Sequence, residues 1–114
     1  MVARRRHLDD RLPSDDLKIA LIYGKTGPLE AYAKQTENGF MLGLEYLTKN
    51  TMKVGDDKLE ILVKDDQLKP DRGKSLLEEC YSDDKADIAV GTNGSPIALA
   101  MLPIAEEKKK VLIV

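Results

Sequence analysis

Residues 87–97 read Asp-Ile-Ala-Val-Gly-Thr-Asn-Gly-Ser-Pro-Ile, and this stretch decides the fold of the chain. The apolar run 88–90 has no polar alternation, which is typical of a strand buried on both faces. The segment 91–94 contains two glycines and predicts a turn. Ser95 is a preferred N-cap and Pro96 a preferred first helical residue, so the sequence predicts a helix capped at Ser95.

A helix that starts directly after a buried parallel strand places its N-terminus at the carboxyl edge of the sheet. Free backbone N–H groups and the positive end of the helix dipole meet there, and both attract anions. The pattern around Ser95 therefore predicts a seat for a small anion, whereas the plainer interpretation is that Ser95 only caps its helix.

The rest of the chain repeats the alternation of strand and helix. Apolar runs bounded by turn residues predict four strands, at residues 17–23, 59–63, 88–90 and 111–114. Apolar side chains at helical spacing predict three helices, at residues 29–49, 70–81 and 96–109. This order predicts an α/β fold, an open parallel sheet with right-handed crossovers and helices on both faces.

The first predicted helix has its apolar face on Phe40, Leu44 and Leu47. Gly39 and Gly43 lie four positions apart in the same helix. Because glycine lowers helix propensity, we expect these two residues to mark a close approach of the helix to the sheet.

The composition excludes several classes of partner. Lys and Arg number 18 against 20 Asp and Glu, which gives a net charge of −2 and no basic surface for nucleic acid or anionic membranes. No apolar stretch approaches the roughly 18 residues of a transmembrane helix. Cys80 is the only cysteine, so neither an internal disulfide nor a cysteine-based zinc site is predicted.

Residues 1–16 are expected to be a polar tail or leader. They contain the run Arg4-Arg5-Arg6, His7 and four aspartates around scattered apolar residues. A secretory signal needs an apolar core after its positive start, so no signal peptide is predicted in this segment. Because His7 is the only histidine, Ser95 has no general base for nucleophilic catalysis, and we expect no enzyme.

Asp65 and Asp66 leave open a signalling module of receiver or flavodoxin class. Paired carboxylates can hold Mg²⁺, but in receiver domains the acidic pair follows the first strand rather than the second. The favoured interpretation is that both carboxylates accept backbone N–H groups where the chain turns toward Pro70. The segment 24–26 also lacks the glycine that a P-loop requires at position 19, so no metal or nucleotide cofactor is predicted.

Several segments are informative together: the strand 17–23, the Thr-Gly-Pro-Leu turn at 26–29, Tyr32, Asn-Gly-Phe at 38–40, residues 64–71, residues 86–91 and residues 103–107. In combination they resemble the substrate-binding proteins of branched-chain amino-acid type ABC importers, the periplasmic binding proteins of type I. The resemblance covers about residues 17–114, and its most specific part is Asp-Asp-Gln-Leu-Lys-Pro-Asp at 65–71. The members most resembled handle hydrophobic or aromatic acids.

The resemblance implies a two-lobed, hinged periplasmic protein that closes on a small carboxylate ligand and delivers it to an ABC permease. It implies a strand order of 2-1-3-4, in the manner of half a flavodoxin-like lobe. It also implies that Ser95, with Asn93 and Gly94, binds the ligand carboxylate at the start of the third helix, and that Tyr32 contacts the ligand side chain.

The sequence departs from the family because it contains no second lobe, so residues 17–114 are expected to be a truncated N-terminal lobe. One wall of a cleft cannot close over a ligand, and we expect weak ligand affinity. In the implied strand order, residues 111–114 form an exposed apolar edge, which predicts a homodimer or domain-swapped oligomer built around this strand. A truncated, self-associating fragment without ligand binding is the remaining alternative.

Overall fold

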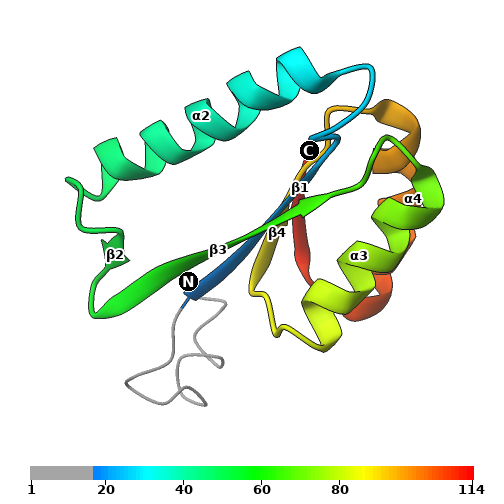
Figure 1. Cartoon of the computed structure of the whole chain (residues 1–114). Helices are drawn as coiled ribbons and strands as arrows, with labels where there is room; N and C mark the ends of the chain where they lie inside the picture. Colours follow the sequence, from blue (N-terminus) through cyan, green and yellow to red (C-terminus); the bar gives the residue numbers. More distant parts are fainter. Residues whose placement is uncertain (1–16) are drawn as a thin grey trace.

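The computed structural model describes residues 17–114, which form one sheet with helices on both faces (Figure 1). In chain order the elements are β1 (Leu17–Tyr23), α2 (Glu30–Leu47), β2 (Lys53–Val54), β3 (Asp57–Asp65), α3 (Pro70–Ser82), β4 (Ile88–Val90), α4 (Ser95–Lys108) and β5 (Val111–Ile113). The predictions made for the tail at residues 1–16 lie outside the described residues.

The sheet has the strand order β2-β3-β1-β4-β5. The four predicted strands correspond to β1, β3, β4 and β5, and neighbours among them all pair in parallel. Their order in the sheet, β3-β1-β4-β5, confirms the predicted order 2-1-3-4. The sequence analysis missed β2, which pairs antiparallel with the start of β3. The sheet is therefore mixed rather than wholly parallel. The strand β2 escaped prediction because two residues, Lys and Val, are too short to give a periodic signal.

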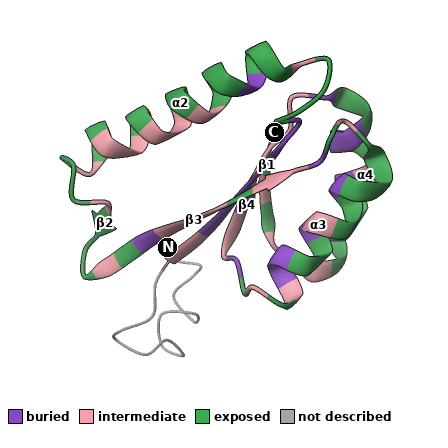
Figure 2. Cartoon of the chain, in the orientation of Figure 1, coloured by how far each residue is buried: buried purple, intermediate pink, exposed green. Residues whose placement is uncertain are grey.

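The two faces of the sheet are covered by different helices, as predicted. Ala20 and Ile22 of β1 point into the larger core cluster, which α3 and α4 complete. Leu21 and Tyr23 point the other way, into a smaller cluster with Ala33 of α2. This alternation follows from the period of two along a strand. Figure 2 shows the purple, buried residues concentrated on β1, α3 and α4, with only one such position on α2.

The apolar face of α2 differs from the prediction in two respects. Phe40 is partly buried against the sheet, but Leu47 is 75% exposed at the end of the helix. A methyl group added to Gly39 or Gly43 would meet no other atom within 4 Å, so these glycines do not mark a close approach. The prediction of a close approach at these two glycines was wrong, because helix propensity alone does not show which helical glycine packs against another element.

The close approach in this fold lies between α3 and α4. A Cβ atom on the buried Gly73 would come within 2.4 Å of Cγ2 of Ile97. Leu77 and Cys80 on α3 and Met101 on α4 are fully buried in the same cluster. Burial raises the pKa of the Cys80 thiol to about 11, which leaves it protonated and of low reactivity at neutral pH.

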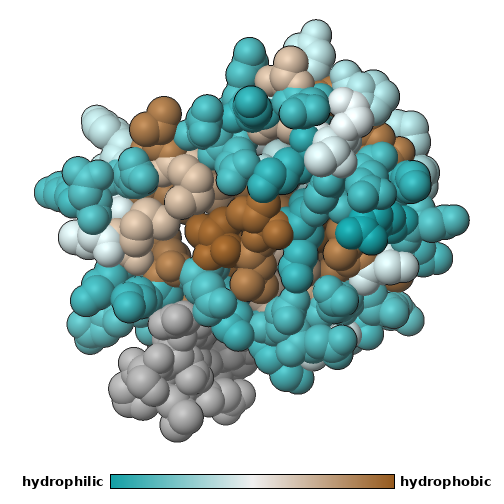
Figure 3. Space-filling view, in the orientation of Figure 1, coloured by the Kyte–Doolittle hydropathy of each residue, from teal (hydrophilic) through white to brown (hydrophobic). Residues whose placement is uncertain are grey.

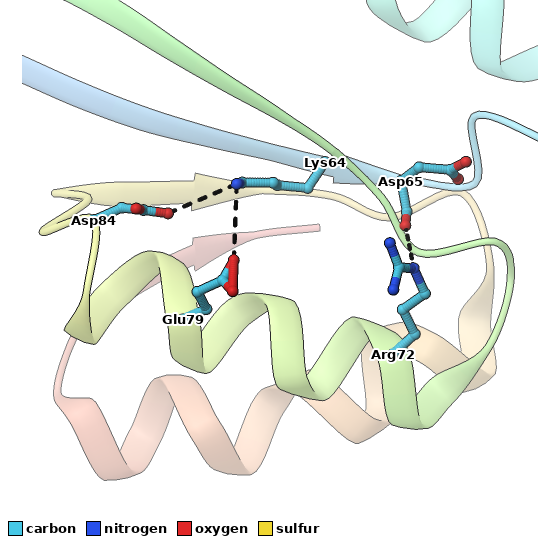
Figure 4. A network of polar contacts seen from close by, with 5 residues as sticks. All are labelled: Lys64, Asp65, Arg72, Glu79 and Asp84. Carbon is cyan, nitrogen blue, oxygen red and sulfur yellow. Dashed lines mark hydrogen bonds and ion pairs between the residues drawn. The ribbon is translucent and has the colours of Figure 1, made fainter.

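Polar contacts also join α3 to the strands, as Figure 4 shows. Lys64 of β3 lies 3.8 Å from carboxylate oxygens of both Glu79 and Asp84, and Nε of Arg72 donates a 2.8 Å hydrogen bond to the main-chain oxygen of Asp65. The ion pairs are partly exposed, so they contribute little to stability. The Arg72 hydrogen bond fixes the start of α3 next to the end of β3, and the ion pairs of Lys64 lie at the other end of the helix.

Candidate functional site

Three loops meet at the carboxyl edge of the sheet. They follow β1, β3 and β4 and span residues 24–29, 66–69 and 91–94. Because these strands are parallel and adjacent, their connections to α2, α3 and α4 leave the sheet at the same end. None of the helices in residues 17–114 is long and apolar enough to cross a lipid bilayer.

The N-terminus of α4 opens onto this edge. The structure places the N-cap at Gly94, whose φ of −124° and ψ of 122° are extended, and Ser95 is the first helical residue. The prediction of Ser95 as N-cap was therefore off by one residue. Ser95 is exposed, and no side-chain cap bond forms at this helix start. Its hydroxyl is consequently not used to close its own helix.

Backbone amides of the first turn of α4 point toward the same space. The amide of Ala98 donates the first bond of the helix, to the oxygen of Gly94 at 3.1 Å. Pro96 has no N–H group, so the amides of Gly94, Ser95 and Ile97 are the donors that the helix itself leaves without partners. These donors and the helix dipole favour a negative group beside Ser95.

Asn93 and Gly94, also predicted as site residues, lie deeper in the loop. Oδ1 of Asn93 accepts a 2.9 Å hydrogen bond from the amide of Gly24, and Nδ2 of Asn93 is buried. Gly94 is buried as well, and a Cβ atom there would lie 2.7 Å from Cδ1 of Ile97 and 3.1 Å from Cδ2 of Leu68. Both residues thus shape the loop that leads into α4.

Tyr32, the fourth predicted site residue, lies in the first turn of α2 and is 63% exposed. Figure 1 shows the start of α2 and the start of α4 at the same end of the sheet. The hydroxyl of the buried Tyr23 donates to the Glu37 carboxylate one turn further along α2 and so fixes this half of the helix. Burial and the bond to Glu37 raise the pKa of Tyr23 well above its ordinary value.

Asp65 holds the β1–α2 loop to the end of β3. Its carboxylate accepts hydrogen bonds from the amides of Lys25, Thr26 and Gln67, at 2.9, 3.3 and 3.0 Å, and from the Thr26 hydroxyl at 2.7 Å. Partial burial acts to raise the pKa of Asp65, but these hydrogen bonds, that of the Thr26 hydroxyl first, outweigh burial and lower it. The carboxylate therefore stays charged and engaged near neutral pH.

Asp66 is fully buried, and its carboxylate joins two loops. Oδ1 accepts from the amide of Leu68 at 2.8 Å, and Oδ2 accepts from the hydroxyl of Thr92 at 2.7 Å. The predicted bonds to the turn before Pro70 are confirmed for both aspartates, and these contacts give no support to the receiver-type alternative. The sequence analysis missed Thr92, because its hydrogen bond to Asp66 spans 26 positions and no local sequence pattern indicates it.

Among residues 17–114, no group of three or more His, Cys, Asp or Glu side chains could hold a metal ion. At the start of α4 the groups available to a ligand are hydrogen-bond donors, a serine hydroxyl and helix amides, whereas the Asp65 and Asp66 carboxylates are engaged with the loops. Such a set suits the binding of a small anion.

Comparison with known proteins defines the family. The periplasmic binding protein family matches residues 16–114, nearly the whole chain. The chain belongs to this family. Proteins of this family bind solutes for transport and are not enzymes, in agreement with the expectation from the sequence.

Individual periplasmic binding proteins resemble the chain over most of its length. A structure described as an ABC-type branched-chain amino acid transporter from Rhodopseudomonas palustris CGA009 is 66% identical, with a TM-score of 0.84 over 85% of this chain and 26% of that one. A solute binding protein of an ABC transporter from Rhodopseudomonas palustris BisB5, in complex with 3,4-dihydroxy benzoic acid, is 33% identical, with a TM-score of 0.78 over 87% of this chain and 26% of that one.

A curated relative, the Leu/Ile/Val-binding protein homolog 6 of Brucella abortus, is 29% identical over 103 residues, which are 89% of this chain and 25% of the relative. The chain thus spans about a quarter of the length of the relatives it matches.

Proposed function

We propose that residues 17–114 are part of the N-terminal lobe of a periplasmic solute-binding protein that serves an ABC importer. The proposed ligand is a small carboxylate with an apolar side chain, a branched-chain or other hydrophobic amino acid or an aromatic acid. Two relatives support this class, one named for Leu, Ile and Val and the other in complex with a dihydroxybenzoic acid. The proposed partner of the full-length protein is the ABC permease, and the proposed location is the periplasm.

The observation that carries the proposal is the position of Ser95. Its side chain is exposed in the first turn of α4, at the end of a buried parallel strand, beside helix amides that lack partners in the helix. In the proposed site, the hydroxyl and the amides of Ser95 and Ile97 bind the ligand carboxylate. Asn93 and Gly94 present this turn, and the Tyr32 ring contacts the apolar part of the ligand.

We expect the affinity of this chain for such ligands to be weak. Specific pockets bury most of the surface of a small ligand, whereas an exposed helix start and one tyrosine cover only one side of it. A dissociation constant of about 1 mM or higher is therefore expected for 3,4-dihydroxybenzoate and L-leucine.

The experiment is an NMR titration of the labelled chain with 3,4-dihydroxybenzoate, followed through the amide resonances of Ser95 and Ile97. Ser95→Ala is expected to weaken binding about tenfold, because it removes one hydrogen bond to a charged group. Ser75→Ala, at an exposed position on α3, is the matched control and is expected to change nothing.

Three results would contradict this proposal. The amides of the α4 start could fail to shift, the amide analogue 3,4-dihydroxybenzamide could bind as well as the acid, or both serine variants could bind equally. Low-micromolar affinity in the wild-type chain would contradict the expected weakness, because it would require a closed pocket.

A second proposal concerns self-association through β5. This strand is the last in the sheet, and its Val111 and Ile113 side chains are 55% and 52% exposed. The amide of Gly91 donates to the oxygen of Ile113, so the main-chain groups of Leu112 face away from β4. An exposed strand without a charged side chain commonly recruits a second strand.

The other edge of the sheet is better protected against such pairing. Figure 3 shows apolar side chains in the middle of one face, where β3 runs in Figure 1, with hydrophilic residues above, below and to the right of them and further apolar residues to the left. β3 carries Glu60 and Lys64 within the strand, and β2 covers its first residues. Charged residues and short covering strands are the usual means of blocking edge pairing. The proposed homodimer therefore forms through β5.

Light scattering over a range of concentrations tests this second proposal. The wild-type chain is expected to approach twice the monomer mass, and Ile113→Lys is expected to remain monomeric because it places a charge in the paired edge. Val54→Lys is the matched control, since Val54 is 54% exposed but lies on the opposite edge. A monomeric wild-type chain at high concentration, or an equal effect of both variants, would contradict the dimer.

A further inference from the structure

Asp66 is the only fully buried charged side chain among residues 17–114, and it lies behind the proposed ligand site rather than in it. Its carboxylate accepts the amide of Leu68 at 2.8 Å and the hydroxyl of Thr92 at 2.7 Å, and its own amide donates to the oxygen of Tyr23 at 2.9 Å. A buried carboxylate is retained only when its oxygens are well satisfied, and these bonds satisfy it. Asp66 thus connects the β3–α3 and β4–α4 loops to the last residue of β1.

The contact from Asp66 continues toward the β1–α2 loop. Thr92 is followed by Asn93, whose Oδ1 accepts the amide of Gly24 at 2.9 Å. The Leu68 side chain packs closely over Gly24, since a Cβ atom added there would lie 2.8 Å from Cδ2 of Leu68. This packing connects the β1–α2 loop back to the β3–α3 loop. The hydrogen bonds and this packing contact form a closed ring, defined here as the loop ring, of Gly24, Asp66, Leu68, Thr92 and Asn93.

We infer that Asp66 and Thr92 are positioning residues, which set the direction of the first turn of α4 by way of the loop ring. The inference rests on the proposed function insofar as this turn is the ligand site. Hydrogen bonds to a carboxylate are short and strong, and this one holds the backbone two residues before Gly94. The amides of Ser95 and Ile97 follow within one turn, so their direction depends on where Thr92 is held.

Thr92→Val and Thr92→Ser form the matched pair that tests this inference. Valine has nearly the shape of threonine but lacks the hydroxyl, whereas serine keeps the hydroxyl and loses only a methyl group. A purely packing role for Thr92 would make serine more harmful than valine. A positioning role through the hydroxyl makes serine resemble the wild-type residue.

The measurement is amide hydrogen exchange of Gly24, read against the amide of Leu21 in the buried part of β1. In Thr92→Val, we expect Gly24 to exchange about tenfold faster, because Asn93 is no longer held in place, while Leu21 keeps its rate. In Thr92→Ser, both rates are expected to stay near the wild-type values. An unchanged Gly24 rate in Thr92→Val, or an equal or greater acceleration in Thr92→Ser, would overturn the inference.

Asn93→Ala provides a second variant in case Thr92→Val folds poorly. It removes the acceptor of the Gly24 amide one link further along the loop ring, and we expect the same local acceleration of about tenfold. An unchanged exchange rate of the Gly24 amide in Asn93→Ala would overturn the loop ring itself.

Titration with 3,4-dihydroxybenzoate is run separately. If the wild-type chain shows no response, the proposed function fails, while the exchange comparison, made without ligand, still decides the positioning role.

Discussion

Asp66→Ala is expected to lower the free energy of unfolding by about 3 kcal/mol. The substitution leaves the Leu68 amide and the Thr92 hydroxyl without their acceptor, and each buried donor left unpaired costs roughly 1–3 kcal/mol. Urea unfolding followed by circular dichroism measures the loss, with the slope of the transition compared between variants.

Two control variants separate this effect from the loss of any acidic residue. Asp66→Asn keeps an acceptor for Leu68 and offers a donor to the Thr92 oxygen, so a smaller loss of about 1 kcal/mol is expected. Asp83→Ala, at an exposed position after α3, is expected to stay within about 0.5 kcal/mol of the wild-type chain. If Asp66→Ala were no more harmful than Asp83→Ala, the carboxylate of Asp66 would have no role in holding the loops.

Gly73→Val is the second substitution with a large expected effect. A Cβ atom at position 73 lies 2.4 Å from Cγ2 of Ile97, so valine forces α3 and α4 apart. Overpacking of a core typically costs about 1–3 kcal/mol, and we expect the upper end of that range because the contact is already closer than real atoms allow. Gly39→Val is the matched control within α2. It has open space around it and is expected to change stability by less than about 0.5 kcal/mol.

A double-mutant cycle tests whether the contact with Ile97 causes the loss of stability in Gly73→Val. Ile97→Ala removes the Cγ2 atom that valine at position 73 would strike, although alone it costs about 2–5 kcal/mol as a core deletion. The double variant Gly73→Val/Ile97→Ala is expected to lose at least about 1 kcal/mol less than the sum of the single losses. Simple additivity in urea unfolding would show that valine is accommodated elsewhere.

Much of the fold could be predicted because its signals are local. Apolar runs gave the four parallel strands, and Pro96 after a turn gave the start of α4 to within one residue. Gly94 rather than Ser95 is the N-cap, although serine is the more preferred residue, because glycine is also accepted at this position and the preference is small. β2 escaped detection because its two residues exist as a strand only through pairing with β3.

The parts that could not be predicted depend on contacts between distant segments. Gly39 and Gly73 are both helical glycines with the same propensity, yet only Gly73 faces another helix. Likewise, the bond from the Gly24 amide to Oδ1 of Asn93 joins distant segments and has no local signal, while the expected ligand contact of Asn93 remains a prediction. The roles of Ser95 and Tyr32 depend on a ligand and remain predictions, although both side chains are exposed at the expected edge.

The bond between Gly24 and Asn93 spans 69 positions, and this separation has a consequence for biosynthesis. While the ribosome is still adding the last third of this chain, the segment up to α3 can already condense and its first loop can bind Asp65, but the amide of Gly24 still lacks its acceptor on Asn93. The first turn of α4 can therefore reach its final position only after position 93 has left the exit tunnel.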